Sequence, residues 1–148
     1  MKLELVLPGC PYVKKGTQQF VMRGRRPVVV NSPQFDAWVA SQMLRRRIYH
    51  HAFRGCGLPL TCEVSVSLHV YLPQEQGGRG GDLIGYMEAV ADLLQAEKWS
   101  KPRPNKPSRM LRNGLGIIAD DRQIVNWDDS WPFVDRDNPR CEITITTI

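Results

Sequence analysis

The sequence lacks two features that would place the chain in a membrane or in an oxidising compartment. Its apolar runs are far too short to span a bilayer, and Met1 is not followed by the basic and apolar regions of a signal peptide. The chain has 4 cysteines, but none of them forms a C-x-x-C pair. Scattered cysteines of this kind are typical of reduced thiols. The sequence therefore predicts a cytoplasmic protein with no membrane partner.

Acidic residues are absent from one long segment, between Glu97 and Asp120. The whole chain has 20 Lys and Arg against 15 Asp and Glu, which gives a net charge of +5. Basic residues gather in three places, within residues 14–26, 45–47 and 98–112. Such clusters favour a phosphate backbone, because binding releases the counterions condensed on it. One cluster alone is more typical of solvated surface, so the inference depends on all three.

The periodicity of apolar residues predicts the order of the strands and helices. Apolar residues alternate with polar ones over 3–7 and over 64–72, which indicates two strands with one buried face each. Two apolar runs flank the basic residues 23–26, which predicts a hairpin. Ser32 and Pro33 begin a helix that should run to about Tyr49, and Asp82 begins a second that ends near Leu94.

The second half of the chain predicts an exposed loop and two closing strands. Prolines at 102, 104 and 107 argue against a regular element between Ser100 and Ser108, so we expect a basic, exposed excursion there. Residues 124–133 and 141–148 are expected to form the last strands. The element order predicts a single α+β domain over residues 1–148, with a mixed β-sheet packed by two main helices.

Two groups of acids stand out in this basic chain. Asp120 and Asp121 are adjacent and precede an apolar run, and Asp82 stands at the start of the second helix. Adjacent carboxylates repel each other unless a cation compensates them, and Mg²⁺ prefers hard oxygen ligands of this kind. Taken singly, a helix cap at Asp82 and a turn at Asp120–Asp121 are the more ordinary interpretations. Together the acids favour a metal-dependent enzyme that acts on a polyanion.

Motifs along most of the chain resemble the RusA family of Holliday-junction resolvases, small endodeoxyribonucleases often encoded by prophages. The strongest match is the run Asp120-Asp121-Arg122-Gln123-Ile124-Val125. The others are Lys14-Lys15 before the hairpin and the segments 27–33, 81–83, 89–94 and 138–143. The resemblance implies a homodimer in a prokaryotic cytoplasm, phage-encoded or not. It also implies Mg²⁺, with Mn²⁺ as a substitute, and paired nicking of four-way (branched) DNA junctions.

The resemblance also assigns roles to particular residues. Asp82, Asp120 and Asp121 correspond to catalytic acids. The family usually begins its helix with D-L-D-N-x-x-K, whereas here the second acid is Ile84 and the lysine is Glu88. Positions 84 and 88 lie on one helical face, so Glu88 can place a carboxylate near the space left at Ile84. We therefore expect a metal set of Asp82, Glu88 and Asp121, with Asp120 close by.

Basic residues supply the expected DNA contacts. Lys14 or Lys15 would also supply the positive charge that the family's catalytic lysine provides and that this chain lacks at Glu88. The expected DNA-binding residues are Lys14, Lys15, Arg23, Arg25, Arg26, Arg79, Lys101, Arg103 and Lys106. The segment between Trp99 and Leu115 is longer than the family's usual connection. Two alternatives to a resolvase stay open. One is a weakened or inactive relative that binds branched DNA without cutting it, and the other is an unrelated small basic module that binds RNA or DNA.

Overall fold

The computed structural model describes residues 1–9, 11, 19–30, 33–74 and 83–148, and its centre is a mixed β-sheet. The strand order is β1 (Lys2–Pro8), β9 (Arg140–Thr147), β4 (Val64–Leu72) and β7 (Ile124–Trp127). β8 (Trp131–Val134) also pairs with β4. β9 is antiparallel to β1 and β4, whereas β7 and β8 run parallel to β4. The predicted α+β class with a mixed sheet is confirmed.

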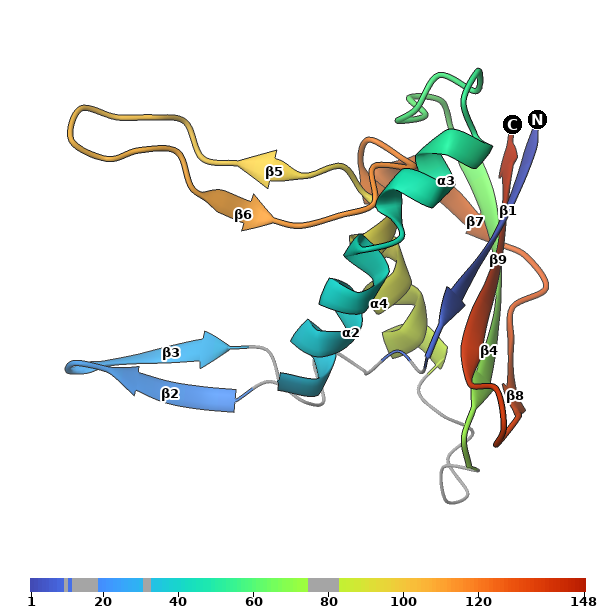
Figure 1. The fold of residues 1–148 in the computed structure, drawn as a ribbon, viewed down its shortest axis with the longest axis horizontal. Coiled ribbons are helices and arrows are strands. Elements are labelled where there is room, and N and C mark those ends of the chain that lie inside the picture. Colours follow the sequence, from blue (N-terminus) through green and yellow to red (C-terminus); the bar gives the residue numbers. More distant parts are fainter. Residues whose placement is uncertain (10, 12–18, 31–32, 75–82) are drawn as a thin grey trace.

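One face of the sheet carries the core. The side chains of β4 alternate strictly between buried and half-buried, and Val64, Val66 and Leu68 are fully covered. Leu5 and Ile143 from the neighbouring strands join them. Helices α2 (Pro33–Met43) and α4 (Leu83–Leu94) cover this face, as Figure 1 shows. No helix in the described ranges is long and apolar enough to cross a membrane.

The first predicted helix is divided in the structure. α2 ends at Met43, and a separate helix, α3 (Arg46–Ala52), follows, so the expectation of one continuous helix to Tyr49 was wrong. At the break Leu44 is 85% exposed, which shows that the apolar pattern does not continue there. Starting a new helix turns Tyr49 toward the sheet, where its hydroxyl donates to the carbonyl of Val6 at 2.6 Å. A tertiary contact has overridden local helix propensity.

The last predicted strand before β9 is also divided. Ile124–Trp127 and Trp131–Val134 form two strands that pair one after the other along β4, rather than one strand to Phe133. Between them Asp129 adopts a φ of 47°, which a continuous strand does not allow. The nitrogen of Leu68 in β4 donates to the Ser130 hydroxyl at 3.0 Å, so the interruption is held to the sheet by a side chain.

Two hairpins extend from the helical side of the core, and we call them the first and the second arm (Figure 1). The first arm is β2 (Gln19–Arg23) with β3 (Arg26–Val30), which confirms the predicted hairpin. The second arm is β5 (Lys98–Trp99) with β6 (Met110–Arg112) and the turn between them. Helices α2 and α4 lie between the sheet and both arms.

The second arm is exposed as predicted, and residues 100–108 contain no helix or strand, as the prolines indicated, but backbone hydrogen bonds still join the two sides of the arm. The nitrogen of Ser100 donates to the carbonyl of Arg109 at 2.9 Å, and Arg103 and Lys106 exchange backbone hydrogen bonds at 3.0 and 2.9 Å. The donors are residues 100, 103 and 106, and none of them is one of the prolines at 102, 104 and 107. Because proline lacks only the N–H group, it is tolerated in a ribbon wherever that donor is not used.

Candidate nucleic-acid interface and acidic segment

The tip of the first arm carries two arginines that face each other. Arg23 and Arg26 are direct partners in the antiparallel register of β2 and β3, and Arg25 lies in the turn between them. All three are exposed. Like charges directly opposite one another across a hairpin destabilise it by a few tenths of a kcal/mol to about 1 kcal/mol. The hairpin is therefore built with a repulsion that an anion at its tip would relieve.

The second arm repeats this arrangement. Arg103 and Lys106 are paired at its tip, and Lys98 is paired with Arg112 at its root. Lys101 and Arg109 lie between these pairs and are exposed, as are both residues at the tip. The segment 98–112 holds six basic residues and no acid. Of the DNA contacts predicted from the sequence, Arg23, Arg25, Arg26, Lys101, Arg103 and Lys106 all lie exposed on the two arms.

The root of the second arm is fixed to the core by three kinds of contact. Arg112 donates to the carbonyl of Ala96 from two of its nitrogens, at 3.2 and 3.3 Å. Arg46 of α3 forms an ion pair with Glu97. A Cβ at Gly114 would lie 2.0 Å from the carbonyl oxygen of Gln95, so only glycine fits there. The arm therefore leaves the core in a defined direction.

Asp120 acts as a cap in the structure. It precedes the short 3₁₀ helix η1 (Asp121–Gln123) and accepts from the nitrogen of Arg122 at 3.0 Å. The Gln123 side chain accepts in turn from the nitrogen of Asp120 at 2.8 Å, which completes a capping box. The Arg122 guanidinium also binds the carboxylate at 2.8 and 3.2 Å. These hydrogen bonds hold the pKa of Asp120 far below its usual range.

Asp121 follows this cap and is exposed at the start of η1. The preceding segment is bound to the C-terminal end of α4, since Leu115 and Ile117 donate to the carbonyls of Leu93 and Leu94 at 2.7 and 2.9 Å. Gln123 donates to the carbonyl of Leu60 at 2.9 Å and fixes η1 from the other side. Asp120 and Gln123 therefore hold Asp121 in place beside α4.

Glu88 lies half-buried within α4, one turn after Ile84, which is 69% exposed. Both positions belong to one helix and share a face, as the substitution argument requires. The replacement of the lost carboxylate by Glu88 stays a prediction. Four of the predicted site residues lie outside the described residues, namely Asp82, Lys14, Lys15 and Arg79.

The described residues alone do not complete a metal site. Among them, no three or more His, Cys, Asp or Glu residues are grouped so that they could hold a metal ion. Glu88 and Asp121 are two of the three predicted ligands, and a full set needs Asp82 as well. The segment 115–118 that leads toward η1 is bound to the C-terminal end of α4, whose 12 residues make it about 18 Å long. The triad stays a prediction.

A hollow at the root of the second arm contains acids that sequence reasoning missed. Its volume is about 200 Å³, and it is lined by residues of α2, α4 and β6. Asp36, Asp92 and Arg112 are its charged groups. Asp36 looked like an ordinary acid in a first helical turn. A signal for Asp92 did exist in the sequence, because it stands four residues after Glu88 and so on the same helical face.

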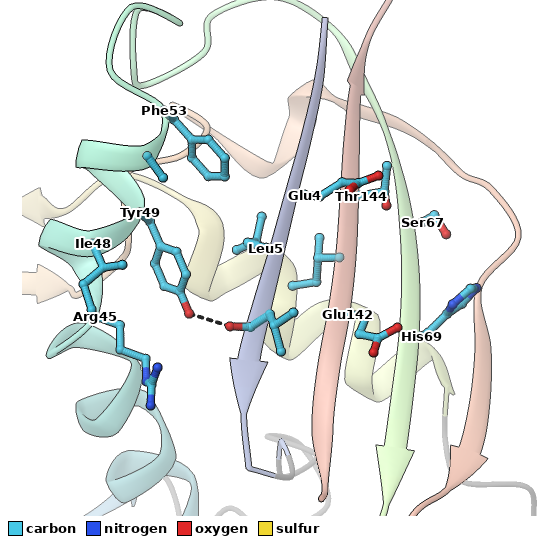
Figure 2. Close-up of a pocket in the computed structure, with 13 residues that line it drawn as sticks. Glu4, Leu5, Arg45, Ile48, Tyr49, Phe53, Ser67, His69, Glu142 and Thr144 are labelled. Atoms are coloured by element: carbon cyan, nitrogen blue, oxygen red, sulfur yellow. Dashed lines mark hydrogen bonds between the residues drawn. The ribbon is translucent and has the colours of Figure 1, made fainter.

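A larger hollow of about 550 Å³ lies between α3 and the strands β1, β9 and β4 (Figure 2). Two of its polar groups, Glu142 and His69, are bound to neighbours. Glu142 accepts from Arg140 at 2.8 Å, and the ring of His69 lies 2.8 Å from the carbonyl oxygen of Asp129. Arg45 faces the hollow from the helical side. This mixture of signs does not form a basic surface for nucleic acid.

Comparison of the sequence with protein-family models and with curated proteins found no match. The motifs quoted above remain the basis of the likeness to resolvases, and the geometry of the arms is an independent observation.

Proposed function

We propose that the protein is a Mg²⁺-dependent, structure-selective endodeoxyribonuclease that resolves four-way DNA junctions as a homodimer by paired nicking. One structural observation carries the nucleic-acid part of this proposal: two exposed basic arms extend from the same side of the core, each with a pair of cations facing each other at its tip (Figure 1). A fold gains nothing from such pairs by itself, whereas a phosphate backbone stabilises them.

The acids supply the nuclease part of the proposal. Asp121, Glu88 and Asp82 would hold the metal, and the capping box of Asp120 fixes the short helix η1, in which Asp121 is the first residue. Bound there, Mg²⁺ would polarise the scissile phosphate and activate the attacking water. Arg122 pairs with Asp120, its Nε lying 2.8 Å from the carboxylate. Paired nicks need two related sites, which closed two-fold symmetry provides.

A second candidate function is binding of branched DNA without cleavage. It is favoured by the exposed apolar side chain of Ile84 at the position where the family has an acid. It uses the same two arms and needs no metal. An unrelated RNA-binding or DNA-binding module, the third alternative, would also use the arms but would show no preference for a branch point.

A nicking assay on a synthetic four-way junction, with and without Mg²⁺, tests the proposal. We expect the wild type to cut only with the metal, and Asp121→Asn to bind the junction without cutting it, because the substitution removes one charge at nearly constant volume. Asp137→Asn is the matched control, since Asp137 is an exposed acid in the loop before β9. Glu88→Gln should behave like Asp121→Asn.

Three outcomes contradict the proposal in different ways. A wild type that binds junctions but cuts none with Mg²⁺ or Mn²⁺ is a binding protein. Equal affinity for branched and linear DNA, or for RNA, indicates the unrelated module. Normal cutting by Glu88→Gln leaves the resolvase intact but removes Glu88 from its metal set.

A further inference from the structure

The second arm has a defined reach. Beyond the pair Trp99–Met110 at the root, its two sides continue to the turn at Pro104 and Asn105 and are joined near the tip by the bridge of Arg103 and Lys106. Five residues, 100–104, lead outward from Trp99 to that turn. At the rise of an extended chain they span about 17 Å. This length matches about five base pairs of duplex at 3.4 Å each.

The arm is a stiff element and not a flexible tail. Backbone hydrogen bonds tie its two sides together at Ser100–Arg109 and at Arg103–Lys106. The Ser100 hydroxyl adds a further bond by accepting from the nitrogen of Arg109 at 2.9 Å. Three prolines fix φ along the ribbon, and Asn105 takes the positive φ of 64° that the turn requires. Its charges are therefore held at set positions outside the core.

The chemistry of the arm fits the backbone of a duplex better than single-stranded bases. Proteins that hold single strands stack successive bases on aromatic side chains. Residues 100–109 contain no aromatic residue, and Trp99 stands only at the root. Lys101, Arg103, Lys106 and Arg109 occur instead every two or three residues along the ribbon. Charges without stacking groups contact phosphates and carry no base specificity.

We propose that the second arm lies along a duplex stem, outside the branch point, and makes binding depend on the length of that stem. This proposal rests on the proposed function only in taking DNA as the partner, and it does not require cleavage. The tip pair of Arg103 and Lys106 touches the backbone about five base pairs beyond the contact made at the root. A stem that ends before this point cannot reach the tip.

Binding measurements over a series of stem lengths test this inference. The substrates are four-way junctions with stems of about 6 to about 20 base pairs, closed by hairpin loops, and linear duplexes of matched length. The protein is full-length wild type, the tip variant Arg103→Gln/Lys106→Gln, and the control Arg54→Gln/Arg136→Gln. The control removes two exposed cations outside the arms and changes the net charge equally.

We expect the tip variant to bind long stems roughly tenfold more weakly than wild type at physiological salt, with a salt slope smaller by about 2. On the shortest stems the two proteins should bind alike, and the control should follow wild type throughout. A further variant replaces residues 101–108 with Asn-Gly, so that the existing pair Ser100–Arg109 closes a two-residue turn. As the stem is lengthened, the affinity of this variant should reach its plateau at a stem about five base pairs shorter than the stem at which wild-type affinity reaches its plateau.

Several results would overturn the inference. Equal loss by the tip variant on short and long stems would place the tip at the branch point. No loss on any substrate would show that the arm faces away from DNA. Competition by an acidic peptide as effective as duplex of the same charge would assign the arm to a protein partner. Because linear duplexes report on the arm without cutting, a failure of nicking leaves this test unaffected.

Discussion

Two regions of the molecule use arginine in opposite ways. At the start of β9, Arg140 is bound by Asp135 and Glu142, both at 2.8 Å, and its guanidinium lies 3.7 Å from the centre of the Tyr71 ring. That ring stacks on Phe133, with centroids 5.0 Å apart. At the tips of the arms, Arg23 faces Arg26 and Arg103 faces Lys106. A compensated arginine holds strands together, whereas an arginine opposite another cation is available to a partner outside the chain.

Neutralising both tips should have the largest effect on binding. In the variant Arg23→Gln/Arg26→Gln/Arg103→Gln/Lys106→Gln, four phosphate contacts are lost, so the salt slope should fall by roughly 3.6 and affinity on the order of 100-fold. The melting temperature should not fall, because the variant removes two repulsive pairs and no favourable one. Fluorescence anisotropy over a salt series and thermal unfolding measure the two effects. A marked loss of stability would show that the tips serve the fold.

Removing Arg140 should have the reverse effect. Arg140→Ala breaks two ion pairs and the stacking on Tyr71 together, so the melting temperature should fall by several degrees. DNA affinity, measured below that temperature, should change less than twofold. A fall in affinity as large as that of the arm variant would erase the distinction between the two regions.

Low pH should reduce the stability that Asp135 contributes through its ion pair with Arg140. The hydrogen bond from Arg140 lowers the pKa of Asp135, so this carboxylate contributes stability above its unfolded pKa of about 3.9, and that contribution disappears as the pH falls through the lower folded value. We expect the melting temperature of Asp135→Asn to lie below that of wild type at pH 7 and to approach it below about pH 4. A gap that stays constant from pH 7 to pH 2.5 would contradict this linkage.

A single neutralisation at one tip should have the smallest effect. Arg103→Gln removes one repulsive pair and should stabilise the ribbon by about 0.2–0.5 kcal/mol. The change concerns only the arm, so it is measured as slower hydrogen exchange at the amides of Arg103 and Lys106, which are paired in the turn. Ser108→Ala, an exposed change that alters no charge, is the control. Faster exchange in Arg103→Gln would mean that Arg103 supports the turn.

The parts of the fold that were predicted correctly are those where one local pattern dominates. The alternation over 64–72 identified β4, and the basic residues 23–26 identified the first arm. The errors lie where a distant contact decides. The break after Met43 depends on Tyr49 reaching Val6, and the division between β7 and β8 depends on Ser130 bonding to β4. Neither partner is near in sequence, so no local pattern reveals them.

The site was predicted less completely. The exposure of the cations on both arms could be predicted, because the surrounding sequence is polar and basic. Their pairing at the tips could not, because it depends on the strand register, which composition does not specify. The capping role of Asp120 could have been found, because an acid three residues before a glutamine is a capping-box pattern. Asp36 could not, since its place beside Asp92 comes from the packing of α2 against α4.

The backbone bonds around Gly116 have one more consequence. Its nitrogen donates to the carbonyl of Gln95 at 2.9 Å, so the chain leaves the core at Gln95 and returns next to the same residue. Residues 96–114 thus form an insertion whose two ends are held together by hydrogen bonds at the core. Lengthening such an insertion adds little to the entropic cost of closing the loop and leaves the packing of the core unchanged. The second arm can therefore be lengthened, shortened or replaced during evolution while the sheet and helices stay the same.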